Sequence, residues 1–259
     1  MSEAVRPLRQ AAACADRRRA RPSSRLSSQR TRGLLRIAMP NPPKIVVTGF
    51  EPFAHGTENP TLDVLEQLRA ANDIEGDLTT VRMPVDSNRL AALTSAKLDE
   101  IRPDIWISLG VAPGLSVVAV ERLAANVMDF PIADNVGTQH GGHPVFEGGP
   151  AGHLSTLPVK TIADELRAAG IPAKVSNSPS TYLCNQMMYT VLHLITDKAL
   201  NTRAGFIHVP AHPSYVAKQN YPFVDMPSMS IELMTAAVKH AIATSIAVEH
   251  DHRRPGFNY

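Results

Sequence analysis

From Lys44 onward, the chain alternates between short apolar runs and longer segments in which apolar residues recur with helical spacing. The apolar runs predict strands near 45–47, 78–83, 105–109, 117–120, 173–175 and 205–209. The helical spacing predicts helices that begin near residues 60, 87, 158, 184 and 231. Strands that are apolar throughout are typical of parallel sheets covered on both faces. We therefore expect an α/β protein: a single-domain α/β/α sandwich with a mostly parallel, twisted sheet.

Three residues are expected to mark the ends of these helices and strands. Ser87 is expected to cap the second helix, Gly110 to close the third strand, and Gly170 to end the helix over 158–169. The stretch 126–152 is rich in Gly, Asp, Asn and His and shows little periodicity. It predicts a long excursion of loops, with room for a hairpin.

Composition limits the class of protein. With 259 residues, 44% of them hydrophobic, the chain is long enough to bury a sizeable core. No apolar run approaches the roughly 20 residues that span a bilayer, so no membrane association is expected. Cys14 and Cys184 lie far apart in very different surroundings and do not make a disulfide framework. A reducing compartment, the cytoplasm, is the expected location.

The net charge of +2 hides an uneven distribution. Residues 1–36 contain ten arginines and only two acids, a charge of +8, whereas the rest of the chain carries −6. This segment is too polar to join a core and is predicted to be disordered. It has three interpretations: a transit peptide, a nucleic-acid-binding arm, or an upstream extension of a protein whose translation starts at Met39. We favour the third, because the folded pattern begins just after Met39 and has no basic patch, so no nucleic-acid partner is expected.

Three segments follow from these boundaries. Residues 1–40 are expected to form the disordered Arg-rich extension, 41–250 the α/β domain, and 251–259 a solvated C-terminal tail.

Cys184 stands out within the expected domain. A loop-like run of Ser, Asn, Pro and Thr precedes it, and apolar residues with helical spacing follow it. Cys184 is therefore expected at or near a helix N-terminus, where unpaired N–H groups and the helix dipole favour the thiolate. A lone cysteine is also commonly a small buried hydrophobe, and this stretch alone leaves that alternative open.

Two further residues carry possible catalytic chemistry. His208 lies in an apolar strand before a proline-rich turn, where it is either a satisfied core residue or a general base for a cysteine on the preceding βα unit. Glu121 directly follows an apolar strand, and a carboxylate there needs a partner, which Arg122 or a histidine would supply.

Other signals are weaker. Phe50 and Phe53 occupy a loop that would normally be polar, where they either form a satellite core or wall an apolar pocket. His140, His143 and His153 have no cysteine or ordered carboxylate near them and match zinc patterns poorly. The run GFEPFAHG lacks the lysine and hydroxyl residue of a phosphate-binding loop, which argues against a nucleotide enzyme.

Five segments together match a known family: VTGFEPFAHGTENP, AVERLAAN, PSTYLCNQMMY, GFIHVP and PSMS. In order and spacing they resemble those of pyroglutamyl peptidase I, also called pyrrolidone-carboxylate peptidase, from about Lys44 to Val248. The resemblance implies a cysteine peptidase that removes N-terminal pyroglutamate from peptides, on one α/β/α domain that often assembles as a homo-oligomer. It also implies a triad of Cys184 as nucleophile, His208 as general base and Glu121 as the residue that orients the imidazole.

The same resemblance implies that Phe50, Phe53 and Tyr182 line the pocket for the pyrrolidone ring. Aromatic walls suit this flat, uncharged lactam and exclude a charged N-terminus. The chemistry requires no metal or organic cofactor.

The chain departs from the pattern of bacterial members around this pocket. It has Ala54 and His55 in place of a Gly-Gly pair, Val111 in place of a Gln, and Pro131 in place of an Arg. Leu115 ends the run Pro113–Leu115, which stands where those members have Gly-Gly-Arg. None of these positions is in the implied triad. The alternative function is therefore another amide or lactam hydrolase with the same triad and an altered pocket.

Overall fold

The computed structural model describes residues 41–54, 58–218 and 226–254. The predicted extension over 1–40 lies outside these residues, as do His55 and the end of the tail, 255–259. No helix in the described part of the chain is long and apolar enough to cross a membrane.

A six-stranded sheet in the order β2-β1-β3-β10-β4-β9 forms the centre of the fold. Its strands are β1 (Lys44–Phe50), β2 (Asp77–Met83), β3 (Ile105–Val111), β4 (Val118–Glu121), β9 (Ala173–Ser176) and β10 (Arg203–Val209). Every neighbouring pair is parallel except β10 and β4, which are antiparallel. The prediction of a mostly parallel sheet is confirmed, although β4 and β9 run against the other four strands.

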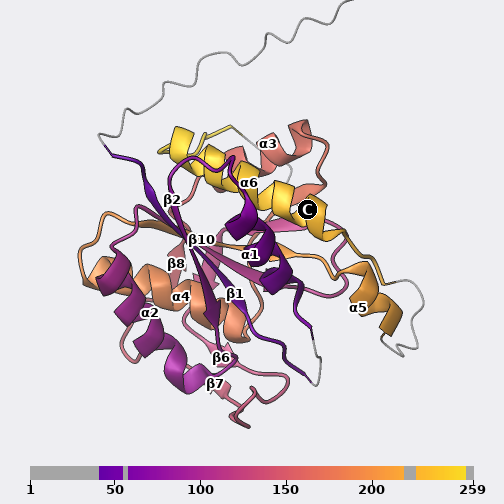
Figure 1. The fold of residues 1–259 in the computed structure, drawn as a ribbon. Coiled ribbons are helices and arrows are strands. Elements are labelled where there is room, and N and C mark those ends of the chain that lie inside the picture. The colour runs from indigo at the N-terminus through magenta and orange to yellow at the C-terminus, as the bar shows by residue number, and fades with distance from the viewer. Residues whose placement is uncertain (1–40, 55–57, 219–225, 255–259) are drawn as a thin grey trace, which may run out of the picture. The chain divides into compact units, whose positions relative to one another are not determined.

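Helices cover both faces of the sheet, as predicted (Figure 1). One face carries α1 (Pro60–Ala70), α3 (Val159–Ala168) and α6 (Ile231–Ala247), and the other carries α2 (Ser87–Ile101) and α4 (Leu183–Asp197). A short helix, α5 (Pro213–Lys218), follows β10 and was not predicted, because its six residues are too few to show a periodic pattern.

The observed ends of the helices and strands test the predictions for Gly170, Ser87 and Gly110. Gly170 follows α3 with a φ of +80°, a conformation that favours glycine, so this prediction is confirmed. The prediction for Ser87 is wrong: Asp86 caps α2 by accepting a hydrogen bond from the Asn88 N–H, and Ser87 is the first helical residue. Gly110 does not close its strand either, because β3 continues to Val111.

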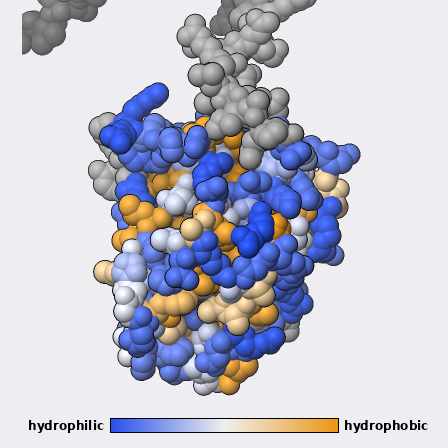
Figure 2. All heavy atoms as spheres, turned by 90° about the vertical axis from the view of Figure 1, so that its left-hand side faces the viewer, coloured by the Kyte–Doolittle hydropathy of each residue, from blue (hydrophilic) through white to orange (hydrophobic). Residues whose placement is uncertain are grey.

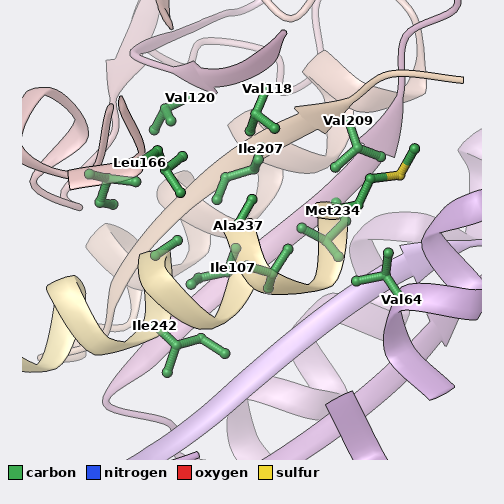
Figure 3. Close-up of a cluster of buried hydrophobic side chains, with 14 of the residues drawn as sticks. Val64, Ile107, Val118, Val120, Leu166, Ile207, Val209, Met234, Ala237 and Ile242 are labelled. Atoms are coloured by element: carbon green, nitrogen blue, oxygen red, sulfur yellow. The ribbon is translucent and has the colours of Figure 1, made fainter. Parts of the chain in front are cut away.

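Two apolar clusters hold the helices against the sheet. Figure 3 shows side chains of β3, β4 and β10 meeting those of α6, among them Ile107, Val120, Ile207 and Met234. On the opposite face, the aromatic residues Trp106, Tyr189 and Phe206 are fully buried. Full burial of such a side chain stabilises the fold by about 1.5–3 kcal/mol. On the face of the molecule shown in Figure 2, the apolar residues form separate patches between hydrophilic ones.

The excursion after β4 forms two small antiparallel sheets. β5 (Leu123–Ala125) pairs with β8 (Gly152–Leu154), and β6 (Met128–Asp129) pairs with β7 (Gly141–His143). The buried amide of Asn185 on α4 accepts from the Ala125 N–H and donates to the carbonyls of Ala125 and Val127. The helix that carries Cys184 therefore anchors this excursion directly.

The described part of the C-terminal tail is not simply solvated, in contrast to the prediction. Asp251 accepts hydrogen bonds from the backbone N–H groups of Lys160 and Thr161 and from the Thr161 hydroxyl, at 2.8–3.0 Å. Among the described residues, the N-cap of α3, Pro158, offers no side-chain cap. Asp251 therefore satisfies the first turn of α3 from a distance in sequence, as an ordinary N-cap does.

Candidate active site

Cys184 is the second residue of α4, as the prediction of a helix N-terminus requires. The N-cap residue is Tyr182, whose backbone is extended (φ −87°, ψ −164°) and which, within the described residues, makes no side-chain capping bond. Cys184 is half-buried and free. Because the first turn of the helix lacks a cap, its N–H groups and the helix dipole are available to a negative charge beside this thiol.

His208 and Glu121 form a buried pair on two neighbouring strands. In the antiparallel register of β10 and β4, Phe206 lies opposite Glu121 and His208 opposite Ala119, so both functional side chains leave the same face. His208 Nδ1 lies 2.8 Å from Glu121 Oε1, with both side chains less than a tenth exposed. The partner that Glu121 needs is therefore His208 and not Arg122.

The third contact joins His208 to Cys184. The Cys184 thiol lies close enough to the imidazole to raise its pKa, and the Glu121 bond to Nδ1 leaves Nε2 as the imidazole atom free for the sulfur. Burial by itself lowers the pKa of His208, but Cys184 and Glu121 outweigh it and raise that pKa to about 10. The structure thus brings Cys184, His208 and Glu121 into one chain of contacts and holds the imidazole in its charged form near neutral pH.

The three predicted aromatic residues belong to the apolar cluster on the α4 face of the sheet and differ in burial. Phe50 is buried in the cluster beneath α4, whereas Phe53 is half-buried with its ring centroid 6.2 Å from that of Tyr182. The Tyr182 hydroxyl donates to the Ala133 carbonyl, and burial raises the pKa of this phenol to about 12, assisted by Asp134 and Cys184. Tyr182 is therefore a neutral ring.

Phe130 is an aromatic neighbour that the sequence reasoning missed. Its ring packs edge-on against Tyr182, at a centroid distance of 4.7 Å, and against His140, at 4.9 Å. Asp129 and Thr181 exchange hydrogen bonds, which holds this segment beside the start of α4. Phe130 carries the same signal that singled out Phe50 and Phe53, an apolar ring in a polar loop.

Asp134 was also missed. Its buried carboxylate accepts from both the N–H and the hydroxyl of Ser87 and from the N–H groups of Val136 and Thr138. Burial raises the pKa of Asp134, but these donors outweigh it and the net shift is downward. A charged Asp134 thus fastens the loop before His140 to the start of α2.

The histidines considered as metal ligands do not converge on one point, because His140 and His143 are neighbours whereas His153 pairs with His193. His140 packs against Phe130 and His143 and contacts the Ser87 hydroxyl, whereas His153 Nε2 lies 3.2 Å from His193 Nδ1. In the described part of the chain, no group of three or more His, Cys, Asp and Glu side chains has an arrangement that could hold a metal ion.

The structure describes the positions at which the chain departs from the family pattern, except His55. Val111 directly follows Gly110 at the end of β3, Leu115 is half-buried in the turn beyond it, and Pro131 is exposed next to Phe130. Ala54 adopts a φ of +53°, in the left-handed region that favours glycine. Val111, Leu115 and Pro131 are therefore apolar side chains that solvent reaches.

Comparisons with known proteins show the family of the chain. Residues 43–248 match the family model described as pyroglutamyl peptidase. Pyrrolidone-carboxylate peptidase 1 of Ralstonia nicotianae is 37% identical over 214 residues, which cover 83% of this chain and 98% of the relative. The pyrrolidone-carboxylate peptidase of Thermococcus kodakarensis is 41% identical over 201 residues, covering 77% and 94%.

Solved structures give the same result. The crystal structure of Bacillus amyloliquefaciens pyroglutamyl peptidase I superimposes with a TM-score of 0.76 and 32% identity, covering 81% of this chain and all of the other. The pyrrolidone carboxyl peptidase of Thermococcus litoralis gives 0.76 and 35%, covering 82% and 99%. The chain belongs to the pyroglutamyl peptidase family.

Proposed function

We propose that this protein is a cysteine peptidase that removes N-terminal pyroglutamate from peptides, with Cys184 as nucleophile, His208 as acid and base, and Glu121 as the residue that orients the imidazole. The carrying observation is the chain of contacts from the Cys184 thiol through His208 to the buried carboxylate of Glu121. Family membership supports the substrate class.

Acylation begins with the sulfur of Cys184 as a thiolate and the imidazole of His208 protonated. Cys184 Sγ attacks the carbonyl that joins pyroglutamate to the next residue, and the electron pair of the C=O moves onto oxygen. The uncapped N–H groups at the start of α4 stabilise this oxyanion. When the tetrahedral intermediate collapses, the C–N bond breaks and His208 Nε2–H protonates the leaving amine. Pyroglutamate is then bound to Cys184 as a thioester, and His208 is neutral.

Deacylation restores the resting state. Neutral His208 takes a proton from water, whose oxygen attacks the thioester carbonyl, and the C–S bond breaks to release pyroglutamate. The sulfur leaves as thiolate beside the protonated imidazole. Throughout the cycle, Glu121 accepts from Nδ1–H, which fixes the tautomer and stabilises the imidazolium. No cofactor takes part in this cycle.

The rings beside Cys184 supply the proposed pocket. Phe53 and Tyr182 are neighbouring half-buried rings, Tyr182 directly precedes the helix that carries the thiol, and Phe50 is buried in the same apolar cluster. A neutral lactam enters such a pocket at little cost, whereas a charged N-terminal amine would lose its hydration without gaining a partner.

A second candidate is another amide or lactam hydrolase that uses the same three residues. The observation that favours it is the apolar character of Val111, Leu115 and Pro131, which stand where the family pattern has Gln and Arg. Such an enzyme would react with thiol reagents at Cys184 but would leave pyroglutamyl substrates intact.

One experiment distinguishes these candidates. A fluorogenic pyroglutamyl-amide is given to the wild type and to Cys184→Ser, and iodoacetamide labelling of Cys184 is measured in parallel. We expect release of fluorophore by the wild type and a loss of at least about 10³-fold in the variant. A labelled wild type without turnover would favour the second candidate, and full activity after alkylation would overturn both.

Three further proposals concern context. We propose that 41–250 is the functional domain and that the protein acts in the cytoplasm, since a free nucleophilic thiol needs a reducing compartment.

We also propose a homo-oligomer, dimer or tetramer. The cross-strand pair Leu123 and Leu154 is a candidate contact, because the two side chains are 38% and 64% exposed side by side on β5 and β8. Light scattering of the wild type and of Leu123→Ser/Leu154→Ser tests the assembly.

A further inference from the structure

Cys184 lies close to the backbone of β3 at Gly110, a residue outside the three proposed catalytic residues. A Cβ atom placed on Gly110 would lie 2.8 Å from Cys184 Sγ, far inside ordinary van der Waals contact. The same Cβ would lie 2.8 Å and 2.9 Å from Cζ and Cε1 of Phe206. The sulfur and the Phe206 ring therefore share the space that a side chain at position 110 would fill.

Gly110 also lies beside the histidine. In the parallel register of β3 and β10, Gly110 is paired with His208, so the sulfur lies over the backbone directly next to the base. The Phe206 ring packs against the His208 ring at a centroid distance of 4.9 Å. From this packing we infer that Gly110 is a positioning residue: its missing side chain lets the Cys184 sulfur settle against β3 within hydrogen-bonding reach of His208. The part of this inference that concerns turnover rests on the proposed function.

The packing also decides which group would move if a methyl were added. Phe206 is completely buried in the cluster beneath α4, and its displacement would disturb many close contacts. Cys184 is half-buried, and its sulfur is the end of a short side chain that rotates about χ1. In Gly110→Ala, the sulfur is therefore the atom that gives way, and it moves off β3 and away from His208.

The test is Gly110→Ala, measured in two ways. The first readout is the rate of iodoacetamide alkylation of Cys184 between pH 5.5 and 9.5, which needs no substrate. We expect the variant to be alkylated at pH 6 at least about 10-fold more slowly than the wild type, because its sulfur no longer lies beside the His208 imidazole. The second readout is turnover: kcat falls by about 10²-fold with little change in KM, as for a misplaced reacting atom.

Gly205→Ala is the matched control. A Cβ at Gly205 in β10 would lie 2.5 Å from Ser155 Oγ and 2.8 Å from Leu157 Cδ1, which is comparable crowding on the opposite face of the sheet. We expect this variant to lose stability but to keep the wild-type alkylation profile and kcat. An unchanged profile and kcat in folded Gly110→Ala would overturn the inference, as would an equal change in both variants.

A second variant keeps the test decisive if Gly110→Ala does not fold. In Gly110→Ala/Phe206→Leu the smaller side chain removes the contacts of the methyl with the Phe206 ring, but the methyl still meets Cys184 Sγ. We therefore expect a folded protein in which Cys184 is alkylated at pH 6 at least about 10-fold more slowly than in Phe206→Leu alone. A folded double variant that reacts as fast as Phe206→Leu would overturn the inference. Because alkylation is independent of the substrate, absence of pyroglutamyl turnover in the wild type would count against the proposed function and leave the positioning of the thiol testable.

Discussion

Two histidines that each contact a titratable partner, His208 and His153, have pKa values that are shifted in opposite directions. His208 is almost fully buried, yet its pKa is raised, whereas half-buried His153 has a lowered pKa. Burial lowers the pKa in both cases. The partner makes the difference, because His208 faces Glu121 and the Cys184 sulfur, while His153 faces His193 at 3.2 Å. The charge of the partner, and not the depth of the site, decides which of these histidines is an imidazolium at neutral pH.

Removal of the carboxylate is expected to have the largest effect. In Glu121→Gln the neutral amide still accepts from His208 Nδ1–H but no longer stabilises the imidazolium, so burial lowers the pKa of His208. We expect kcat/KM for a pyroglutamyl-amide to fall by about 10²–10⁴-fold. The control is Glu66→Gln on the exposed face of α1, which should change nothing. Turnover within about threefold of the wild type would remove Glu121 from the mechanism.

The same pair predicts a pH dependence of stability. The pKa of His208 is about 10 in the folded protein and about 6.5 in an unfolded chain. The folded state therefore holds its proton more tightly, and this contribution is complete below pH 6.5 and is lost as the pH rises through 10. Urea unfolding should show that the loss of stability in Glu121→Gln, relative to the wild type, is larger at pH 6.5 than at pH 10. A loss of equal size at both would contradict the ionic description of the pair.

The His153–His193 pair is expected to show the opposite sign and a smaller effect. The pKa of His153 is below its unfolded value, so its contribution is present above pH 6.5 and is lost on acidification. We expect His153→Gln to be about 1 kcal/mol less stable than the wild type at pH 8, because one hydrogen bond is lost. At pH 5.5 the difference in the free energy of unfolding between the two proteins should be smaller, because protonation of His153 destabilises the folded wild type. His250→Gln, at a side chain that is 88% exposed, is the control with no pH-dependent difference.

The comparison also shows what the sequence could predict. Helical spacing and continuous apolar runs located the main strands and helices, because these patterns reflect local burial. They also placed Cys184 at a helix start. The partner of Glu121 was left open between Arg122 and a histidine, because the antiparallel contact of β4 with β10 joins segments 87 residues apart. No local period encodes such a contact.

Other residues were missed or misread for related reasons. Phe130 and Asp134 lie in the excursion after β4, where no period marks which side chains turn inward. Asp251 looked like part of a solvated tail, although it caps a helix that begins 92 residues earlier. Gly110 was predicted to end a strand, because glycine often does. In the structure, the sulfur of Cys184, from a helix distant in sequence, occupies the space that a side chain at position 110 would need.

A third histidine pair separates the effect of charge from that of burial, and it predicts the smallest effect. His252 Nε2 lies 2.8 Å from Asp164 Oδ2, with the same partner chemistry as the His208 pair but with side chains 24% and 51% exposed. Asp164 also pairs with Arg167 on the surface of α3. Water screens both contacts, so Asp164→Asn should lower the free energy of unfolding by less than about 1 kcal/mol and leave turnover unchanged. Urea unfolding at pH 6 measures this loss. A loss as large as that of Glu121→Gln would mean that a carboxylate partner stabilises a histidine pair equally well without burial.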